Sequence, residues 1–305
     1  MDMRAVTIDA FGQMPDVRQI DVPADVPAGR ILVRVHAAGV NPIDSLIARG
    51  LFTPFPVTFP LTLGLDFAGV VDRAGDAANR YAEGDRVCGR AVGTFADYVL
   101  VAENETVSPI PESIGFAEAA ALPSAGMTAL TSVEAAGIAG GSRVLIVGAA
   151  GGVGSFAVQF ARRRGGYVIA TAREEDAAYV KTLGANETVD YTRDDAMFPQ
   201  DLDALLDFAS GAPALVALSG RVRKGGAVVS TRYVADVDTL AKRDIRAINI
   251  KNQPTAELMR RVTEAVANGE VAVPEIHTYP LEQAAEVLAR FERGQHVRGK
   301  LVLLP

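Results

Sequence analysis

A glycine-rich segment between an apolar stretch and a helix-like stretch constrains the fold of this chain most strongly. Residues 143–147 (Arg-Val-Leu-Ile-Val) form a near-continuous apolar run, which is typical of a strand covered on both faces. The sequence Gly-Ala-Ala-Gly-Gly-Val-Gly follows at 148–154, and the pattern then predicts a helix to about residue 164. Glycine lets the backbone approach a diphosphate closely, and the N–H groups at a helix start attract its oxygens. The segment therefore predicts a dinucleotide site.

The residues after this segment continue an alternation of strands and helices. Ala149 takes the first glycine position of the strict G-x-G-x-x-G pattern, so the neighbouring strands carry much of the prediction. We expect these strands at 167–171, 187–190, 204–208, 227–231 and 245–250. The alternation predicts an α/β fold with a doubly wound parallel sheet. The expected cofactor contacts are Ala150, Gly151, Gly152 and Val153 on the glycine turn, and Phe208 at the end of the fourth strand.

The end of the second strand bears on the choice between NAD and NADP. An NAD site carries an acid there to hold the ribose hydroxyls, whereas this chain has Thr171 followed by Ala172 and Arg173. A guanidinium suits a 2′-phosphate, so we expect NADPH and include Thr171, Arg173 and Tyr191 as contacts. The acids at 174–176 oppose this reading by repelling a phosphate. A solvated arginine at a helix start and a half-buried strand-end tyrosine are the plainer alternatives.

The first third of the chain has a different pattern. Short alternating strands are predicted at 31–36, 67–72, 86–88 and 95–101, with Gly, Pro and Asp between them. This spacing indicates an antiparallel, barrel-like domain. We expect residues 301–304 to return to it, so that the α/β unit is inserted between its two halves.

Length and composition narrow the function class. The chain has 305 residues and a mass of 32.1 kDa, which fits two domains. Its net charge is −7 with no basic block, which argues against nucleic acid as the main partner. No apolar run approaches the roughly 18 residues of a membrane span. The single cysteine, Cys88, excludes an intramolecular disulfide and a multi-cysteine zinc cage, and it favours a reducing, cytosolic location.

Seven short sequence segments are specific when taken together, although few of them are informative alone. They are 38–44 (Ala-Gly-Val-Asn-Pro-Ile-Asp), 63–71 (Leu-Gly-Leu-Asp-Phe-Ala-Gly-Val-Val), 83–87 (Glu-Gly-Asp-Arg-Val), 122–129 (Leu-Pro-Ser-Ala-Gly-Met-Thr-Ala), 148–154, 224–226 (Lys-Gly-Gly) and 299–302 (Gly-Lys-Leu-Val). With them the chain resembles the medium-chain dehydrogenase/reductase superfamily, in particular its zinc-free quinone oxidoreductase branch, which includes zeta-crystallin-like proteins. The resemblance implies a Rossmann domain at 122–264, inserted in a GroES-like β-barrel catalytic domain at 1–121 and 265–305.

The resemblance also bears on metal chemistry. Zinc-dependent relatives carry a cysteine where Asn41 stands, and Gly-His-Glu where this chain has Gly64-Leu65-Asp66. Leu65 cannot ligate a metal, and Asn41 is a poor zinc ligand. We therefore expect no metal and no alcohol oxidation. The expected acceptors are quinones and α,β-unsaturated carbonyls, whose electron-poor carbons take a hydride without a Lewis acid.

By the same resemblance, Asn41, Asp44 and Thr128 border the nicotinamide as catalytic candidates. Asp44 either holds Asn41 or a backbone amide, or caps a helix at 45–49. Lys300 is a cofactor-site candidate near the cleft, with a surface lysine as the plainer reading. The apolar stretch 46–55 lacks the tyrosines of many relatives, so water or a ribose hydroxyl is the expected proton source.

The sequence thus predicts a cytosolic, NADPH-dependent, zinc-independent reductase of quinones or enones. Two alternatives remain open: an enoyl-thioester reductase of the same superfamily, and an NADPH-binding or sensing protein with little catalysis. We also expect a homodimer, because a sixth strand at 245–250 would leave an open sheet edge.

Overall fold

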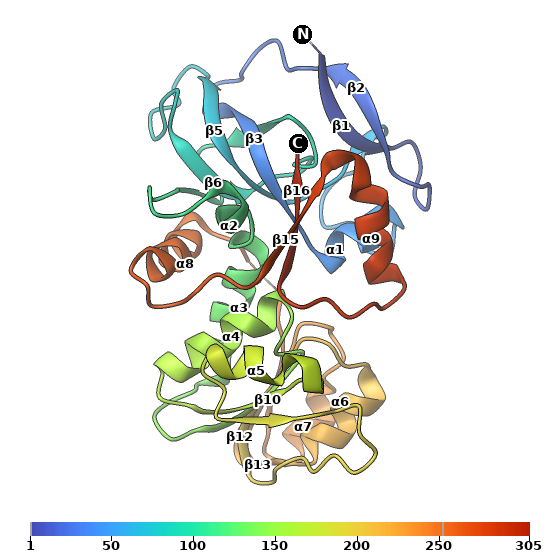
Figure 1. Ribbon diagram of the computed structural model, residues 1–305, viewed down its shortest axis with the longest axis vertical. Helices are drawn as coiled ribbons and strands as arrows, with labels where there is room; N and C mark the ends of the chain where they lie inside the picture. Colours follow the sequence, from blue (N-terminus) through green and yellow to red (C-terminus); the bar gives the residue numbers. More distant parts are fainter. Residues whose placement is uncertain (1, 252) are drawn as a thin grey trace. The chain divides into compact units, whose positions relative to one another are not determined.

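The computed structural model describes residues 2–251 and 253–305, which form two compact units (Figure 1). Of the described residues, the first unit contains 2–124, 254–296 and 300–305, and the second contains 125–251, 253 and 297–299. The return to the first unit therefore comes at Pro254, earlier than the expected boundary at 265. The reason is that α8 (Ala256–Ala267) packs against β8 (Val107–Pro109) of the first unit.

The first unit is built from two β-sheets. The larger has the order β15-β16-β3-β5-β6-β8, with β7 also paired to β3, and the smaller has the order β2-β1-β4. All pairs are antiparallel except β15 with β16. The strands are β1 (Asp2–Ile8), β2 (Asp16–Asp21), β3 (Arg30–Val40), β4 (Leu61–Thr62), β5 (Asp66–Ala74), β6 (Arg86–Arg90), β7 (Tyr98–Ala102), β8, β15 (Ile276–Pro280) and β16 (Lys300–Leu304).

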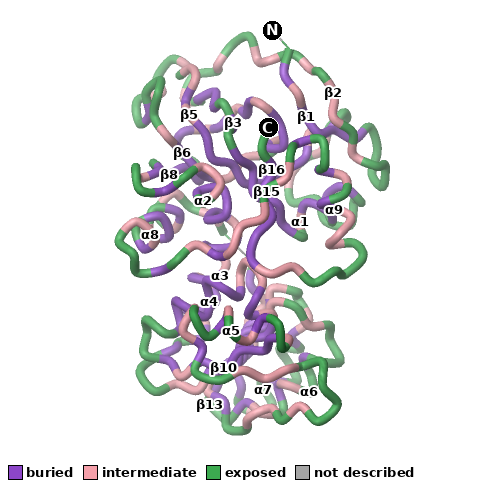
Figure 2. The backbone as a smooth tube through the Cα atoms, viewed as in Figure 1, coloured by how far each residue is buried: buried purple, intermediate pink, exposed green. Residues whose placement is uncertain are grey.

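Short helices pack around these sheets. They are α1 (Pro42–Ala48), α2 (Phe116–Ala120), α8, the 3-10 turn η1 (Leu281–Gln283) and α9 (Ala284–Glu292), while α3 (Pro123–Ala136) begins in the first unit and continues in the second. The start of α8 is capped by Thr255, whose hydroxyl accepts a hydrogen bond from the Leu258 N–H at 3.1 Å. Met259 and Val262 then bury one face of this helix, and Figure 2 shows the same alternation of buried and exposed backbone.

The second unit is a doubly wound α/β domain, as predicted. Its parallel sheet has the order β11-β10-β9-β12-β13-β14. The strands are β9 (Arg143–Val147), β10 (Tyr167–Thr171), β11 (Glu187–Val189), β12 (Leu202–Asp207), β13 (Val222–Ser230) and β14 (Arg246–Asn249), and the helices are α4 (Gly152–Arg163), α5 (Glu174–Thr182), α6 (Ala212–Ser219) and α7 (Val237–Ala241). Strand order reverses at β9, where such folds bind their ligands at the carboxyl edge.

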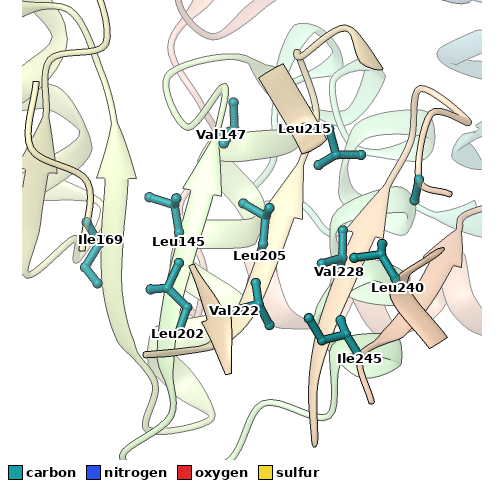
Figure 3. Packing of buried hydrophobic residues seen from close by; sticks show 11 residues of the cluster. Leu145, Val147, Ile169, Leu202, Leu205, Leu215, Val222, Val228, Leu240 and Ile245 are labelled. Carbon is teal, nitrogen blue, oxygen red and sulfur yellow. The ribbon is translucent and has the colours of Figure 1, made fainter. Parts of the chain in front are cut away.

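Both faces of this sheet are covered. On one face, Leu145 and Val147 of β9 lie in a cluster with Leu205 of β12 (Figure 3). Leu215 from α6 and Leu240 from α7 cover this cluster. Ile146 points to the opposite face, because side chains alternate along a strand, and it is buried too. The near-continuous apolar run of β9 is thus explained by burial on both sides.

Among the described residues, no helix is both long and apolar enough to cross a membrane.

Candidate functional site

The glycine turn after β9 has the backbone geometry of a diphosphate cradle. Gly148 has a φ of +76°, which turns the chain sharply away from the strand. A Cβ at Gly154 would lie 2.1 Å from the Gly148 carbonyl oxygen, so only glycine lets α4 start this close to β9. At Gly151, in contrast, a Cβ would meet no atom nearer than 3.5 Å, and this space can admit a ligand. The expected contacts at 150–153 lie on this turn, beside the N–H groups that begin α4.

The neighbouring strand ends support the turn. Thr171, at the end of β10, is buried, and its hydroxyl oxygen accepts a hydrogen bond from the Gly148 N–H at 3.1 Å. Phe208 is half-buried beside the turn, and its N–H donates to the Val147 carbonyl at 3.2 Å. The position of Thr171 is therefore that of a residue that holds the loop, and its predicted contact with the cofactor stays a prediction.

Arg173 and Tyr191, both predicted to contact the cofactor, lie side by side. Arg173 is the residue before α5, and its Nε donates to the Tyr191 hydroxyl at 3.2 Å. Its Nη1 also lies 3.8 Å from a carboxylate oxygen of Glu175. Tyr191 is 46% exposed and the Arg173 side chain 39%. A guanidinium has five N–H donors, so the bond to Tyr191 leaves donors for an anion.

Sequence reasoning missed a segment that packs against the same turn. Residues 297–299 belong to the second unit, where the Gly299 N–H donates to the Ala150 carbonyl at 2.8 Å. The Arg298 guanidinium lies 3.5 Å from the buried carboxylate of Asp176 and over the ring of Tyr179. These residues are about 150 positions downstream of the glycine turn, and no local pattern indicates that they pair with it.

In the first unit, a buried polar cluster forms at one end of four adjacent strands. Strand pairing sets Gly39 of β3 opposite Asp66, Asp66 opposite Arg90, and Val40 opposite Leu301. Asn41 follows β3 directly, and Lys300 precedes Leu301 at the start of β16. The sheet register therefore brings together residues that are up to 259 positions apart.

Hydrogen bonds connect this cluster throughout. Asn41 Nδ2 donates to Asp66 Oδ2 at 2.9 Å, and Lys300 Nζ donates to Asn41 Oδ1 at 2.7 Å and to the Val40 carbonyl at 2.9 Å. Asp44 Oδ2 accepts from the Asn41 backbone N–H at 2.7 Å. Both readings of Asp44 thus describe one bond, which caps α1 and holds Asn41. Lys300 is only 4% exposed, so its reading as a surface lysine is wrong.

Two further residues complete the cluster, and sequence reasoning did not single them out. Ser124, near the start of α3, donates through Oγ to Asp66 Oδ1 at 2.6 Å, and Arg90 Nε lies 3.6 Å from the same oxygen. Asp66 itself appeared only as a replaced metal position, although a charged residue within the apolar stretch 63–71 is a usable signal. Nothing in the local sequence marks Ser124.

Burial shapes the charges of the cluster. Loss of hydration, with a smaller contribution from the neighbouring Asp66 carboxylate, raises the pKa of Asp44 to about 7. Burial lowers the pKa of Lys300, while Asp66 and Asp44 act in the opposite direction. Within the described part of the chain, Asp44 Oδ1 has no hydrogen-bond partner. The cluster balances two carboxylates against the side chains of Lys300 and Arg90.

Thr128 lies in the second unit, on α3. It is half-buried, and its carbonyl accepts a hydrogen bond from Ser132 Oγ at 2.7 Å. Its predicted place beside the nicotinamide stays a prediction.

The donor set around Asn41 does not fit zinc. Leu65 offers no ligand atom, and Asn41 Oδ1 already accepts from the Lys300 ammonium. In residues 2–251 and 253–305, no group of three or more His, Cys, Asp or Glu side chains is arranged to hold a metal ion.

An exposed apolar patch lies near α1 in the first unit. Phe11 packs edge-on against Phe59, with ring centroids 5.1 Å apart. Leu46, Leu51 and Phe52 add further exposed apolar surface.

Comparison with known proteins places this architecture in a family. The alcohol dehydrogenase GroES-like domain model matches residues 27–112, and the zinc-binding dehydrogenase model matches 183–303. A quinone oxidoreductase from Rattus norvegicus is 38% identical over 125 residues, 39% of this chain and 37% of that protein. The chloroplast envelope quinone oxidoreductase homolog of Arabidopsis thaliana is 29% identical over 99% of this chain and 98% of its own.

Solved structures agree with these matches. The quinone oxidoreductase from Coxiella burnetii has a TM-score of 0.90 and 29% identity, with both chains covered completely. The GroES-like sheets, the inserted Rossmann sheet and these relatives lead to one assignment. The chain belongs to the medium-chain dehydrogenase/reductase superfamily, in its quinone oxidoreductase-like branch.

Proposed function

We propose that this chain is an NADPH-dependent, zinc-independent reductase that transfers a hydride to quinones or α,β-unsaturated carbonyls. The observation that carries the proposal is the hydrogen-bonded pair of Arg173, just beyond β10, and Tyr191, just beyond β11. An acid at this place would hold the ribose hydroxyls of NAD, whereas an exposed guanidinium and a phenol suit a 2′-phosphate. The matches to quinone oxidoreductases support the acceptor class.

In the second unit, the glycine turn would hold the diphosphate. The Gly151 N–H donates to the Gly148 carbonyl within the turn, so the backbone N–H groups of Gly152 and Val153 and the positive end of the α4 dipole would face its oxygens. Thr171 would keep the turn in place through its bond to Gly148. Arg173 would then select NADPH by adding charge-assisted hydrogen bonds that NADH cannot make.

In the first unit, the Asn41 carboxamide would face the nicotinamide or the acceptor oxygen. The bound cofactor supplies the hydride from C4 of its nicotinamide. The chain contributes by positioning the two reactants, because quinones and enones need no Lewis acid. The apolar surface at Leu46, Leu51 and Phe52 suits an apolar acceptor, and a water molecule or a cofactor hydroxyl would supply the proton.

We further propose a cytosolic homodimer. β14 forms one edge of the six-stranded sheet, and its unpaired backbone groups could pair with a second copy. The buried single cysteine agrees with a reducing compartment. Light scattering should give twice the chain mass, and a monomer would refute the dimer.

Two measurements on the full chain test the proposed function. Calorimetry should show NADPH binding about tenfold or more tightly than NADH, as expected for an extra charge-assisted contact. Turnover is then compared side by side for a small quinone, an enal and an enoyl-thioester. Preference for the thioester would make the chain an enoyl-thioester reductase. Tight NADPH binding without oxidation by any acceptor would make it a binding or sensing protein.

A further inference from the structure

The orientation of the Asn41 carboxamide is determined by the chemistry of its neighbours. Lys300 Nζ can only donate hydrogen bonds, so the Asn41 atom 2.7 Å away must be the oxygen. Asp66 Oδ1 accepts from Ser124, and Asp66 Oδ2 faces the other end of the Asn41 amide at 2.9 Å, which must be the nitrogen. The oxygen and nitrogen of an asparagine amide are often hard to tell apart, but here the neighbours at both ends determine which atom is which.

This arrangement also polarises the amide. An ammonium at the oxygen and a carboxylate at the nitrogen shift amide electrons in the same direction, and hydrogen bonds in such a chain strengthen one another. Asn41 Nδ2 also donates to the Gly39 carbonyl, at 3.4 Å, which is a longer contact than those of the Asn41 side chain to Asp66 and Lys300. A ligand that accepts a hydrogen bond from the Asn41 amide would compete with this contact.

The Lys300 ammonium also offsets the negative charges of the two buried carboxylates. Asp44 and Asp66 are both buried, and two buried carboxylates without cations would be costly. Asp66 and Asp44 each favour the charged form of Lys300, and burial opposes it. The aliphatic stem of Lys300 enters from the start of β16, so this cation is built into the sheet.

We propose that Lys300 is a positioning residue, whose ammonium fixes the direction of the Asn41 carboxamide and balances the carboxylates of Asp44 and Asp66. It supplies a fixed positive charge at a place where the side chains offer zinc no suitable donor set. The proposal rests on the proposed function in one respect only, because that function gives Asn41 a cofactor or acceptor to face.

The first test separates the ammonium from the rest of the side chain. Lys300→Ala removes Nζ and leaves a space beside Asn41 Oδ1 and the Val40 carbonyl, which a small primary alkylammonium ion can fill. We expect n-propylammonium to raise the melting temperature of this variant, and n-propanol to have no comparable effect. Wild type and Lys224→Ala, which removes an exposed lysine, should not respond to the amine.

No rise in melting temperature, or an equal rise with the alcohol, would overturn the role of the ammonium. If Lys300→Ala does not fold without the amine, its refolding yield replaces the melting temperature. A higher yield with propylammonium than with propanol would support the role of the ammonium, and equal yields would overturn it. Neither readout needs activity. Failure of the proposed function, seen as no turnover by wild type, is therefore distinguishable from failure of this inference.

The second test asks whether the ammonium positions Asn41. Lys300→Met keeps most of the apolar stem and loses the charge, so the amide can turn. We expect kcat to fall about tenfold or more, as for loss of a charge-assisted hydrogen bond. The Kd for NADPH should change by less than about threefold, because Arg173 and the glycine turn belong to the other unit. Propylammonium should restore part of the kcat of Lys300→Ala. Wild-type kcat in Lys300→Met, or an equal loss in kcat and in NADPH affinity, would contradict the positioning role.

Discussion

The polar cluster around Asn41 in the first unit and the Arg173–Tyr191 pair in the second differ in their exposure to water. In the first unit, Asp66 and Lys300 are buried, and both form hydrogen bonds with the Asn41 carboxamide. In the second unit, Arg173 and Tyr191 remain in contact with solvent. Charges interact strongly in a low-dielectric interior and are screened at a surface. The first arrangement therefore fixes side-chain orientation, and loss of one of its members is costly, while the second is available to a ligand.

The difference predicts which property each substitution changes. Substitutions in the buried cluster should reduce stability or turnover, and substitutions around Arg173 should reduce cofactor affinity while leaving stability nearly unchanged.

The largest effect is expected for Asp66→Ala. It removes the acceptor of Asn41, Ser124 and Arg90 at once and leaves buried donors and cations without a partner. Loss of one partner of a buried ion pair costs about 3–5 kcal/mol of unfolding free energy. Asp72→Ala, which removes the partner of the exposed Arg34, should cost at most about 1 kcal/mol. Urea unfolding of both variants measures the difference, and equal losses would contradict the distinction between buried and exposed charge.

Gly154→Ala should have the next largest effect, on cofactor binding. The new Cβ would lie 2.1 Å from the Gly148 carbonyl oxygen, so the turn or α4 must shift. We expect NADPH affinity to fall about a hundredfold, since a small displacement of a positioned site is costly. Gly140→Ala is the control, because a Cβ there meets nothing within 4 Å. Unchanged affinity in Gly154→Ala would show that the turn does not hold the diphosphate.

Arg173→Ala should weaken the binding of NADPH but not of NADH. Loss of charge-assisted bonds to a 2′-phosphate should weaken NADPH binding about 10- to 100-fold and leave NADH binding unchanged. Arg193→Ala serves as the control, because Arg193 is also exposed and pairs locally with Asp195. Calorimetry of wild type and both variants with NADPH and with NADH gives the six affinities. A parallel loss for both cofactors would remove Arg173 from the 2′-phosphate site.

The last prediction concerns Asp44 and the pH dependence of stability. The pKa of about 7 in the folded chain lies above the usual value of 3.8, so the folded state binds this proton more tightly. The resulting stability is fully present below about pH 4 and is lost as the pH rises through about 7. Asp44→Asn keeps an acceptor for the Asn41 N–H but cannot ionise.

Urea unfolding of wild type and Asp44→Asn across this range measures the effect. Wild type should lose stability relative to Asp44→Asn, by at most about 1.4 kcal/mol per pH unit for one proton. Parallel curves for the two proteins would show that Asp44 does not titrate in this range.

The two regions also differ in how far the sequence predicts them. The glycine turn and its flanking strand and helix follow from a motif contained in about 50 residues, and the same stretch indicated Arg173 and Tyr191 as candidates. The hydrogen bond between these two side chains was not predicted. The helices α6 and α7 were not predicted, because the apolar segment 212–219 lacks a helical alternation of polar and apolar residues and 237–241 is a single short turn.

The buried cluster could not be predicted in the same way. Family resemblance indicated Asn41, Asp44 and Lys300, but their mutual contacts depend on the register of β3, β5 and β16. Sheet register is set by tertiary packing, so the partnership of Asp66 with Ser124 has no local signature. The burial of Lys300 contradicts the usual exposure of lysine for the same reason.

Deuteride transfer by chelator-treated protein tests the central claim most directly. The full chain is freed of metal, mixed with NADPH deuterated at C4 of the nicotinamide and with a small quinone or enal, and the product is analysed by mass spectrometry. The proposed function predicts deuterium in the reduced enal. It also predicts that chelator-treated and untreated protein oxidise the deuterated cofactor at the same rate with either acceptor, and that turnover is slower with NADH. Bound cofactor that no acceptor oxidises, or activity that disappears on chelation and returns with zinc, would contradict it.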